Sequence, residues 1–205
     1  MGIFNAELML LRVPAILFAV TVHEYMHARV AYMFGDPTAR NQGRMTLNPI
    51  KHLDVIGTLM LLVAGIGWAK PVPVNPNYFK DPLKHMVYVG LAGPFANFIA
   101  AFLIAKLFLL GIPQYGMLAE VLKVVVQINI FLGVFNLIPI PPLDGSKVIP
   151  YFLSEKARET WWRFEQYGFV VLLLLVFMFS GLLWTIIRVP AELLLRLVFA
   201  GTPVN

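Results

Sequence analysis

The chain has 205 residues, of which 59% are hydrophobic and 13% are charged. Soluble domains carry about 25% charged residues, so this composition excludes an ordinary soluble protein and predicts one membrane-embedded domain over residues 1–205. The formal charge of +5 does not indicate nucleic acid, because the basic residues form no cluster with aromatic residues. Cysteine is absent, so any metal must be held by His, Asp or Glu.

The first apolar segment runs from about Phe4 to Phe34 and contains His23-Glu24-Tyr25-Met26-His27. On a helix, residues i and i+4 share a face, so the two histidines can bind one metal ion, with Glu24 placed to take a proton from a water. Ionisable groups in an apolar helix are expensive and indicate a functional site. The alternative is that the histidines are merely satisfied core groups. Because the pattern lies within this segment, we do not expect a cleavable signal peptide.

Gly35-Asp36-Pro37-Thr38 ends the segment with residues typical of turns, and residues 39–48 are predicted to form short strands or a loop. Leu53 to Trp68 is apolar but interrupted by glycines, and its uncharged part is too short for a span of about 20 residues. We therefore predict a re-entrant loop or hairpin. Residues 70–76 should be extended, because alternate prolines exclude a helix.

Met86 to Leu110, interrupted at Gly93-Pro94, and Met117 to Phe135 are predicted to be full spans. Phe169 to Ile187 is predicted to be the last span, and Arg188 to Phe199 a surface amphipathic helix with Arg188, Glu192 and Arg196 in one stripe. The expected fold is therefore an all-α polytopic membrane protein. It would have about four transmembrane helices, a re-entrant or short β segment and the C-terminal amphipathic helix. Its core is residues 4–147, followed by a C-terminal part, residues 148–205.

Lysine and arginine concentrate in two connecting regions, residues 35–84 and 144–165, whereas residues 111–116 have none. If positive loops stay cytoplasmic, both basic regions face the cytosol and the 111–116 turn faces out. The 53–68 segment must then enter and leave on one side, and both termini lie outside. Trp161 and Trp162 in the polar stretch 154–165 are placed like interfacial anchors.

A catalytic zinc site needs three protein ligands, and Asp144 is the candidate for the third. It follows the proline-rich run 136–142, and Gly145 permits a turn that would aim its carboxylate inward. A lone aspartate at the end of a span is more often a cap or loop residue, but its pairing with two histidines favours metal binding. Rival ligands lie beside lysines at membrane boundaries and are better explained as interfacial residues: His52, His85, Asp54 and Asp81.

Asn97, four residues after Gly93-Pro94, is the other polar group to explain inside a span. Its amide could satisfy a carbonyl freed by the proline or bridge helices. Alternatively, it could donate to the oxyanion of a hydrolytic intermediate. The spacing favours the structural role. Snorkelling or an interhelical ion pair accounts for the charged residues in or near the spans, namely Lys106, Glu120 and Lys123.

Three stretches resemble the site-2 proteases, a family of intramembrane zinc metalloproteases. His23-Glu24-Tyr25-Met26-His27 resembles the first zinc motif, Gly93-Pro94-Phe95-Ala96-Asn97 resembles the Gly-Pro-x-x-Asn element, and residues 136–145 resemble Asn-x-x-Pro-x-Pro-x-x-Asp-Gly. Residues 67–75 also resemble the extended segment that precedes the span with the Gly-Pro-x-x-Asn element in this family. The resemblance implies zinc on His23, His27 and Asp144, Glu24 as the catalytic base, and Asn97 as a participant in substrate or transition-state binding.

The resemblance also implies the substrates, which are transmembrane segments of single-span membrane proteins, cut in the bilayer after local unwinding. An exposed strand edge at Arg44, Met45, Thr46 and Leu47, or at the re-entrant segment, is expected to bind them by β-addition. Relatives often carry a PDZ or cystathionine-synthase-like domain. This chain has no room for either, so gating would come from the spans, a second copy or a regulatory membrane partner. Its compact size suggests a prokaryotic plasma membrane, and His₂Asp suits zinc but also cobalt or iron.

Two other classes of function remain as alternatives to the protease. A catalytically idle membrane scaffold would have no reason to retain Glu24, both histidines and Asp144. A small proton or ion transporter could use His and Asp as a relay, but the spans at 86–135 show no inverted repeat of the first segment. Replacing Glu24 by Gln would separate the three, because only a protease would lose cleavage while keeping its metal.

Overall fold

The computed structural model describes residues 6–64, 67–111 and 115–202. Within these residues all regular elements are helices, which confirms the all-α prediction. The predicted short β segment is absent from the same residues, where extended backbone pairs only as an isolated antiparallel bridge between Leu53 and Ala69. The expectation that both termini face outward falls on residues 1–5 and 203–205, which lie outside the described ranges.

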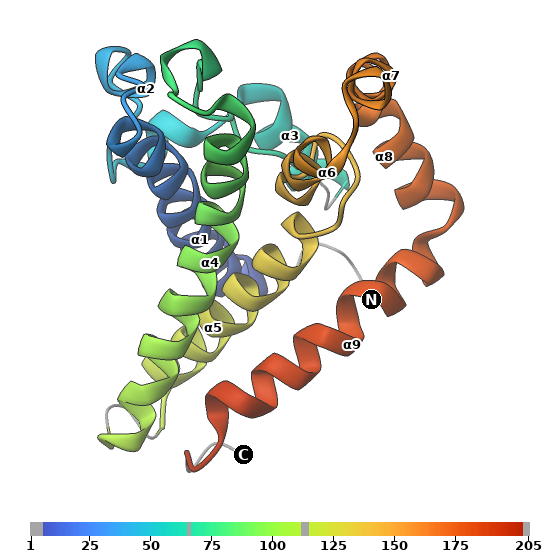
Figure 1. Ribbon diagram of the computed structural model, residues 1–205. Helices are drawn as coiled ribbons and strands as arrows, with labels where there is room; N and C mark the ends of the chain where they lie inside the picture. The colour runs from blue at the N-terminus through green and yellow to red at the C-terminus, as the bar shows by residue number, and fades with distance from the viewer. Residues whose placement is uncertain (1–5, 65–66, 112–114, 203–205) are drawn as a thin grey trace.

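Three long helices form the centre of the molecule: α1 (Ala6–Met33), α4 (Pro82–Leu109) and α5 (Met117–Asn136). Each packs against the other two (Figure 1). Fully buried alanines lie along the contacts, including Ala19 of α1 and Ala101 of α4. Small residues let helix backbones approach closely, which brings polar side chains of different helices within hydrogen-bonding distance.

The predicted interruption at Gly93-Pro94 is wrong, because α4 continues through it. A proline inside a helix removes one backbone hydrogen bond. Packing of α1 and α5 along α4 holds the helix together at this point.

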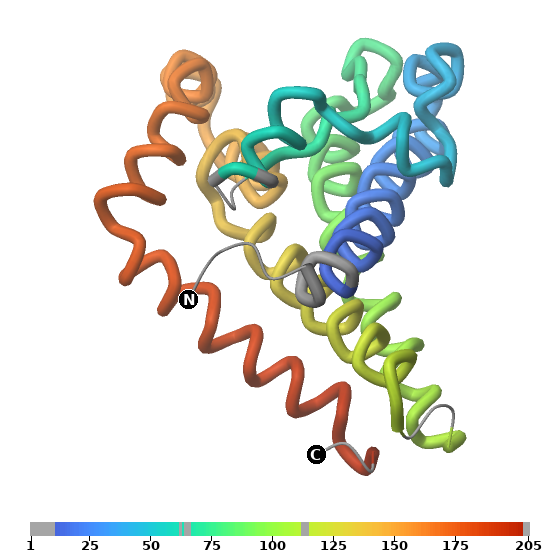
Figure 2. Tube along the Cα trace, turned by 180° about the vertical axis from the view of Figure 1, so that it is seen from behind, coloured from blue at the N-terminus to red at the C-terminus, as the bar shows by residue number. Residues whose placement is uncertain are grey.

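The connection from α1 to α4 contains short helices and bends: α2 (Thr38–Asn41), η1 (Pro49–His52), α3 (Val55–Ala64) and η2 (Pro76–Tyr78). Residues 42–48 are a loop, as one of the two alternatives predicted, whereas residues 39–41 belong to α2; the strand alternative is wrong for both parts. The bridge between Leu53 and Ala69 brings the two ends of the α3 segment together, as a hairpin requires. Residues 70–75 contain neither helix nor strand, as their prolines predict. Seen from behind, this connection crosses one end of the bundle (Figure 2).

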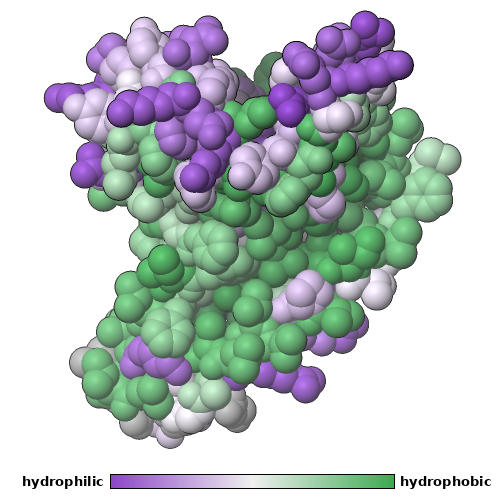
Figure 3. All heavy atoms as spheres, viewed as in Figure 1, coloured by the Kyte–Doolittle hydropathy of each residue, from purple (hydrophilic) through white to green (hydrophobic). Residues whose placement is uncertain are grey.

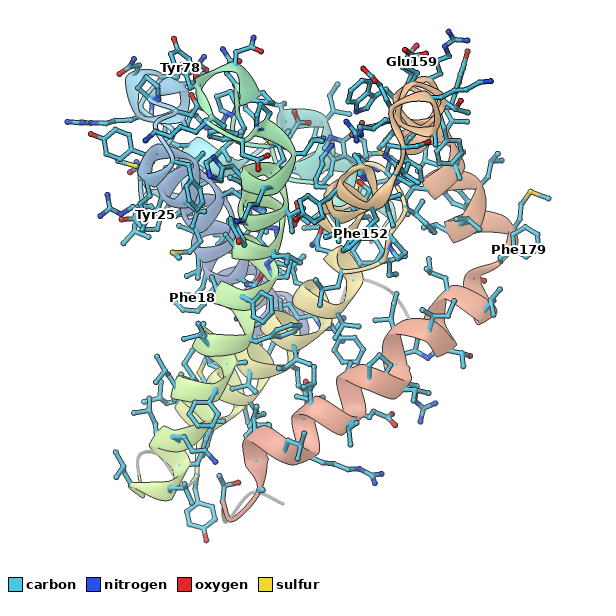
Figure 4. The ribbon with its side chains drawn as sticks, in the orientation of Figure 1. Phe18, Tyr25, Tyr78, Phe152, Glu159 and Phe179 are labelled. Carbon is cyan, nitrogen blue, oxygen red and sulfur yellow. The ribbon has the colours of Figure 1, made fainter. Side chains whose placement is uncertain are left out.

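After α5 the chain turns through η3 (Asp144–Val148) and α6 (Ile149–Phe152) into α7 (Glu155–Glu165), α8 (Gly168–Met178) and α9 (Ser180–Phe199). The predicted single span from Phe169 to Ile187 is wrong, because the helix breaks at Phe179 (Figure 4). Ser180 and Gly181 follow the break, and both residue types have lower helix propensity than the leucines before it.

Helix α9 joins the second half of that expected span to the expected amphipathic helix. Arg188 and Glu192 form an ion pair at 2.5 Å on its charged stripe. Its other face buries Ile187, Ala191 and Val198 in the hydrophobic core with α4 and α5. The helix is therefore part of the bundle rather than a separate surface element.

On the face shown in Figure 3, apolar residues cover the middle of the molecule, and hydrophilic residues gather at the end where α2 and α7 lie. Within the described ranges, α4 and α5 are long and apolar enough to cross a membrane, and α7 with α8, bent by 63°, would add a third span if taken as one. The two basic regions of the sequence thus lie at one end of the molecule, and the end of α4 and the start of α5 lie at the other (Figure 1).

Candidate metal centre

Three side chains meet where α1 passes the start of η3. His23 and His27 lie one turn apart on α1, and Asp144 is the first residue of η3. One ligand atom from each lies within 4.8 Å of the others. Asp144 Oδ2 is 2.8 Å from His23 Nε2 and 3.2 Å from His27 Nε2. Ligand atoms on a tetrahedral zinc ion lie about 3.3–3.5 Å apart, so the separations of the carboxylate oxygen from both nitrogens are near those of a zinc site.

The other ring nitrogen of each histidine is held by α4. His27 Nδ1 donates to the carbonyl oxygen of Val89 at 2.7 Å, and His23 Nδ1 donates to Oδ1 of Asn97 at 2.6 Å. A donated Nδ1 hydrogen fixes the tautomer in which Nε2 carries the lone pair, which is the form that binds a metal. Both histidines are therefore oriented with Nε2 towards Asp144.

Gly93 makes the wall of the centre opposite α1. A Cβ atom at this position would lie 2.4 Å from His27 Nε2 and 2.6 Å from His23 Nε2. Any residue with a Cβ atom at this position would displace these two nitrogens, so the site requires glycine here. The donor set of two imidazoles and one carboxylate is that of a catalytic zinc site, in which a fourth position is left for water or substrate.

Comparisons with known proteins identify the family of this chain. Residues 110–179, which include Asp144, match the model of peptidase family M50. The "Putative zinc metalloprotease YwhC" of Bacillus subtilis is 42% identical over 205 residues, covering 95% of this chain and 93% of the relative. The chain belongs to peptidase family M50, the site-2 protease family.

Two further relatives of the M50 protein are more distant. The "Putative zinc metalloprotease Rip2" of Mycolicibacterium smegmatis is 28% identical, covering 78% of this chain and 64% of the relative. The "Zinc metalloprotease MJ0392" of Methanocaldococcus jannaschii is 26% identical, covering 76% of this chain and 37% of the relative. No solved structure matches the chain significantly. Membership of M50 makes the protein a membrane metalloprotease whose cofactor is zinc.

Asn97 is fully buried, and its amide is committed within the protein. Nδ2 donates to the carbonyl oxygen of Ala19 at 2.9 Å and to Oδ1 of Asn129 at 2.8 Å, while Oδ1 accepts from His23. An amide has two hydrogens, and both are used. The structure therefore favours the alternative in which Asn97 bridges helices, which the spacing also favoured.

Asn129 of α5 was missed in the sequence and belongs to the same network. It is fully buried, and its Nδ2 donates to the carbonyl oxygen of Val125 at 2.8 Å. Its position inside the apolar span from Met117 to Phe135 was the available signal, because a polar residue there needs a partner.

Glu24 lies beside the centre and is 8% exposed. Its Oε2 accepts a hydrogen bond of 2.8 Å from the backbone N–H of Val72 in the extended segment 70–75. In the described part of the chain, Oε1 has no hydrogen-bond donor, so this oxygen is free to act on a substrate or a water.

The expected strand edge at residues 44–47 is wrong, because this stretch bends and two of its residues are used internally. Arg44 is buried and donates through Nη2 to the carbonyl oxygen of Lys70 at 2.6 Å. The carbonyl oxygen of Thr46 accepts from His52 Nε2 at 2.8 Å. Met45 is half-buried, and Leu47 is 63% exposed.

The rival ligands lie outside the metal cluster. His52 is buried and binds the Thr46 carbonyl, and the ring of His85 stacks on Phe34 at a centroid distance of 4.2 Å. Asp54 and Asp81 cap helices, accepting from the N–H groups of Gly57 at 2.8 Å and Lys84 at 3.1 Å. Each residue thus has a structural role.

The charged residues of α4 and α5 also have structural partners. Lys106 donates to the carbonyl oxygen of Val198 at 3.2 Å, near the end of α9. Glu120 and Lys123 form an ion pair of 3.0 Å within α5 rather than between helices.

Proposed function

We propose that this M50 protein is an intramembrane zinc endopeptidase that cleaves transmembrane segments of single-span membrane proteins. The observation that carries the proposal is the buried cluster of His23, His27 and Asp144 inside a bundle that contains the candidate spans α4 and α5. Ionisable groups at such a depth are costly, and a hydrolytic reaction within the bilayer is a reason to keep them there.

In this proposal His23, His27 and Asp144 hold the zinc ion and Glu24 is the general base. Zinc, when bound, supplies a Lewis acid that polarises the scissile carbonyl group and makes a water more acidic. Glu24 takes a proton from the attacking water and passes it to the leaving amine. Asn97 and the Val89 carbonyl hold the two imidazoles in the tautomer that this chemistry needs.

A transmembrane substrate must unwind locally, because a helical peptide bond is screened by its own hydrogen bonds and side chains. Beside α1 lies a cavity of about 480 Å³. Its lining is apolar apart from Thr21 and consists of Pro14, Leu17, Phe18, Thr21, Val22, Leu47 and Pro49. Thr21 of this lining and Glu24 are three residues apart on α1 and are therefore neighbours on one helix face. We place the side chains of the unwound substrate here, against Leu47.

We further propose that the protein is a multi-pass protein of a prokaryotic plasma membrane, surrounded by the lipid bilayer. The positive-inside rule puts the end with α2 and α7 in the cytoplasm, because both basic regions lie there (Figure 1). In this proposal α1 crosses the membrane with the candidate spans α4 and α5, and α7 with α8, taken as one bent span, is the fourth.

The test is to purify the protein in detergent and incubate it with a panel of single-span membrane proteins. Wild type and Glu24→Gln are compared with and without a chelator, and bound zinc is measured in the same samples. We expect cleavage by wild type that is abolished by the chelator and by the substitution, with zinc retained in the variant. Stoichiometric zinc without cleavage of any substrate would favour the scaffold, and transport without cleavage would favour the relay.

A further inference from the structure

The extended segment 70–75 presents a single backbone donor to Glu24. Pro71 and Pro73 have no N–H group, so Val72 carries the only N–H of residues 71–73, and it binds Glu24 Oε2 at 2.8 Å. The flanking prolines fix φ near −65° and keep the backbone extended on both sides of Val72. The direction of this N–H is therefore set by the segment itself.

Buried charged side chains fix both ends of the segment. At one end, the 7% exposed Arg44 donates to the carbonyl oxygen of Lys70 at 2.6 Å. At the other end, the N–H of Asn75 donates to Oδ2 of Asp36, which is 1% exposed, at 2.7 Å. Burying a charge is expensive unless it is hydrogen bonded, so these contacts resist displacement of the segment. Neither side chain belongs to the zinc cluster.

We propose that residues 70–75 form a rigid brace that positions the general base, with Val72 as the positioning residue and Arg44 and Asp36 as its anchors. This inference rests on the proposed protease function. The terminal torsion of a glutamate is soft, and a carboxylate without a partner samples many orientations. The Val72 N–H holds Oε2 and leaves Oε1 as the oxygen that receives the proton. A base must lie within hydrogen-bonding reach of its proton, and a small misplacement slows the reaction strongly.

The first test is Val72→Pro, which removes the N–H while suiting an extended backbone. A hydrogen bond to a carboxylate contributes about 1.5–3 kcal/mol, so we expect kcat to fall about 10- to 100-fold. KM and zinc content should stay within about twofold of wild type, because neither substrate contacts nor zinc ligands change. Two variants are the matched controls and should cleave nearly as wild type. Val72→Ala keeps the N–H of residue 72. Val74→Pro introduces a proline at the next residue that has a backbone N–H.

A second measurement needs no cleavage. Thermal unfolding is recorded for wild type, Val72→Pro, Glu24→Ala and the double variant. If the two groups bind each other, the shift in Tm of the double variant is smaller than the sum of the single shifts. Additive shifts would overturn the brace. If Val72→Pro does not fold, an ester in place of the Val72 amide, introduced by nonsense suppression, removes the same hydrogen with less change of shape.

The outcomes separate this inference from the proposed function. Wild-type cleavage with an equally active Val72→Pro variant overturns the brace and leaves the protease intact. A wild-type protein that cleaves no substrate overturns the protease, and with it the catalytic purpose of the brace. A loss of kcat shared by Val72→Pro and Val74→Pro would also overturn it, because proline at either position would then act through the segment's general stability.

Discussion

Gly93→Ala is the sharpest test of the metal centre, because it adds one methyl group directly against both coordinating histidines. The added Cβ would lie 2.4 Å from His27 Nε2, and ordinary contact begins at 3.4 Å, so the nitrogen or α4 must move by about 1 Å. Zinc–nitrogen bonds of about 2.0–2.1 Å tolerate about 0.2 Å. The substitution should therefore break the geometry of the zinc site.

Two effects on folding stability oppose each other in this variant. Alanine is favoured over glycine inside a helix by about 1 kcal/mol, whereas overpacking costs about 1–3 kcal/mol. The net change in the free energy of unfolding is therefore small. Zinc affinity has no such compensation, and perturbing the surroundings of a metal ligand typically lowers it 10- to 100-fold, which is the least we expect. Zinc is measured per mole of monodisperse protein at fixed free zinc, together with cleavage and Tm.

Gly133→Ala is the matched control for this prediction. A Cβ there would lie 2.4 Å from Cε1 of Phe98, so the overlap is as severe, and the helix propensity gained is the same. The contact is between two helices and involves no metal ligand, so zinc content should stay at the wild-type value. A Gly93→Ala variant that binds zinc and cleaves like wild type would refute the geometry of the centre.

Two more substitutions test the surroundings of the zinc ligands. Asn97→Leu removes the acceptor of His23 Nδ1. We expect the zinc affinity, measured in competition with a chelator, to fall about 10- to 100-fold. Unchanged affinity would mean that His23 needs no partner at Nδ1. His85→Phe should keep stoichiometric zinc and full cleavage, because the His85 ring packs against the aromatic rings of Phe34, Phe79 and Tyr88, outside the metal cluster. Metal loss in this variant would make His85 a ligand.

The sequence was sufficient to select the three residues that meet in the candidate metal centre, because each lies in a recognisable local pattern. His23 and His27 are related by one helical turn, and Asp144, 121 residues from His23, follows a proline-rich run that ends a span. The apolar segments likewise predicted α4 and α5, since periodicity and length are local properties. Local sequence patterns do not predict the contacts that backbone N–H and C=O groups make.

The errors have a common physical origin in tertiary contacts. Arg44 was expected to meet substrate, but it is buried against the carbonyl of Lys70, a partner that no spacing rule identifies. The resemblance implied that Asn97 takes part in substrate or transition-state binding, whereas its amide hydrogens are donated to the Ala19 carbonyl and to Asn129, which lies on a different helix. The helix break at Phe179 was also not predicted, because the run from Phe169 to Ile187 is apolar apart from Ser180, Gly181 and Thr185.

Helix α4 contributes to the centre as directly as α1, although it supplies no ligand. Val89, Gly93 and Asn97 follow one another at intervals of four residues and therefore lie on one face of the helix. The first orients His27, the second leaves room for both Nε2 atoms, and the third orients His23. Gly93 and Asn97 act through a missing side chain and an amide, so both can be recognised in a sequence. Val89 acts through a carbonyl that every residue has, so its part in the site could come only from the structure.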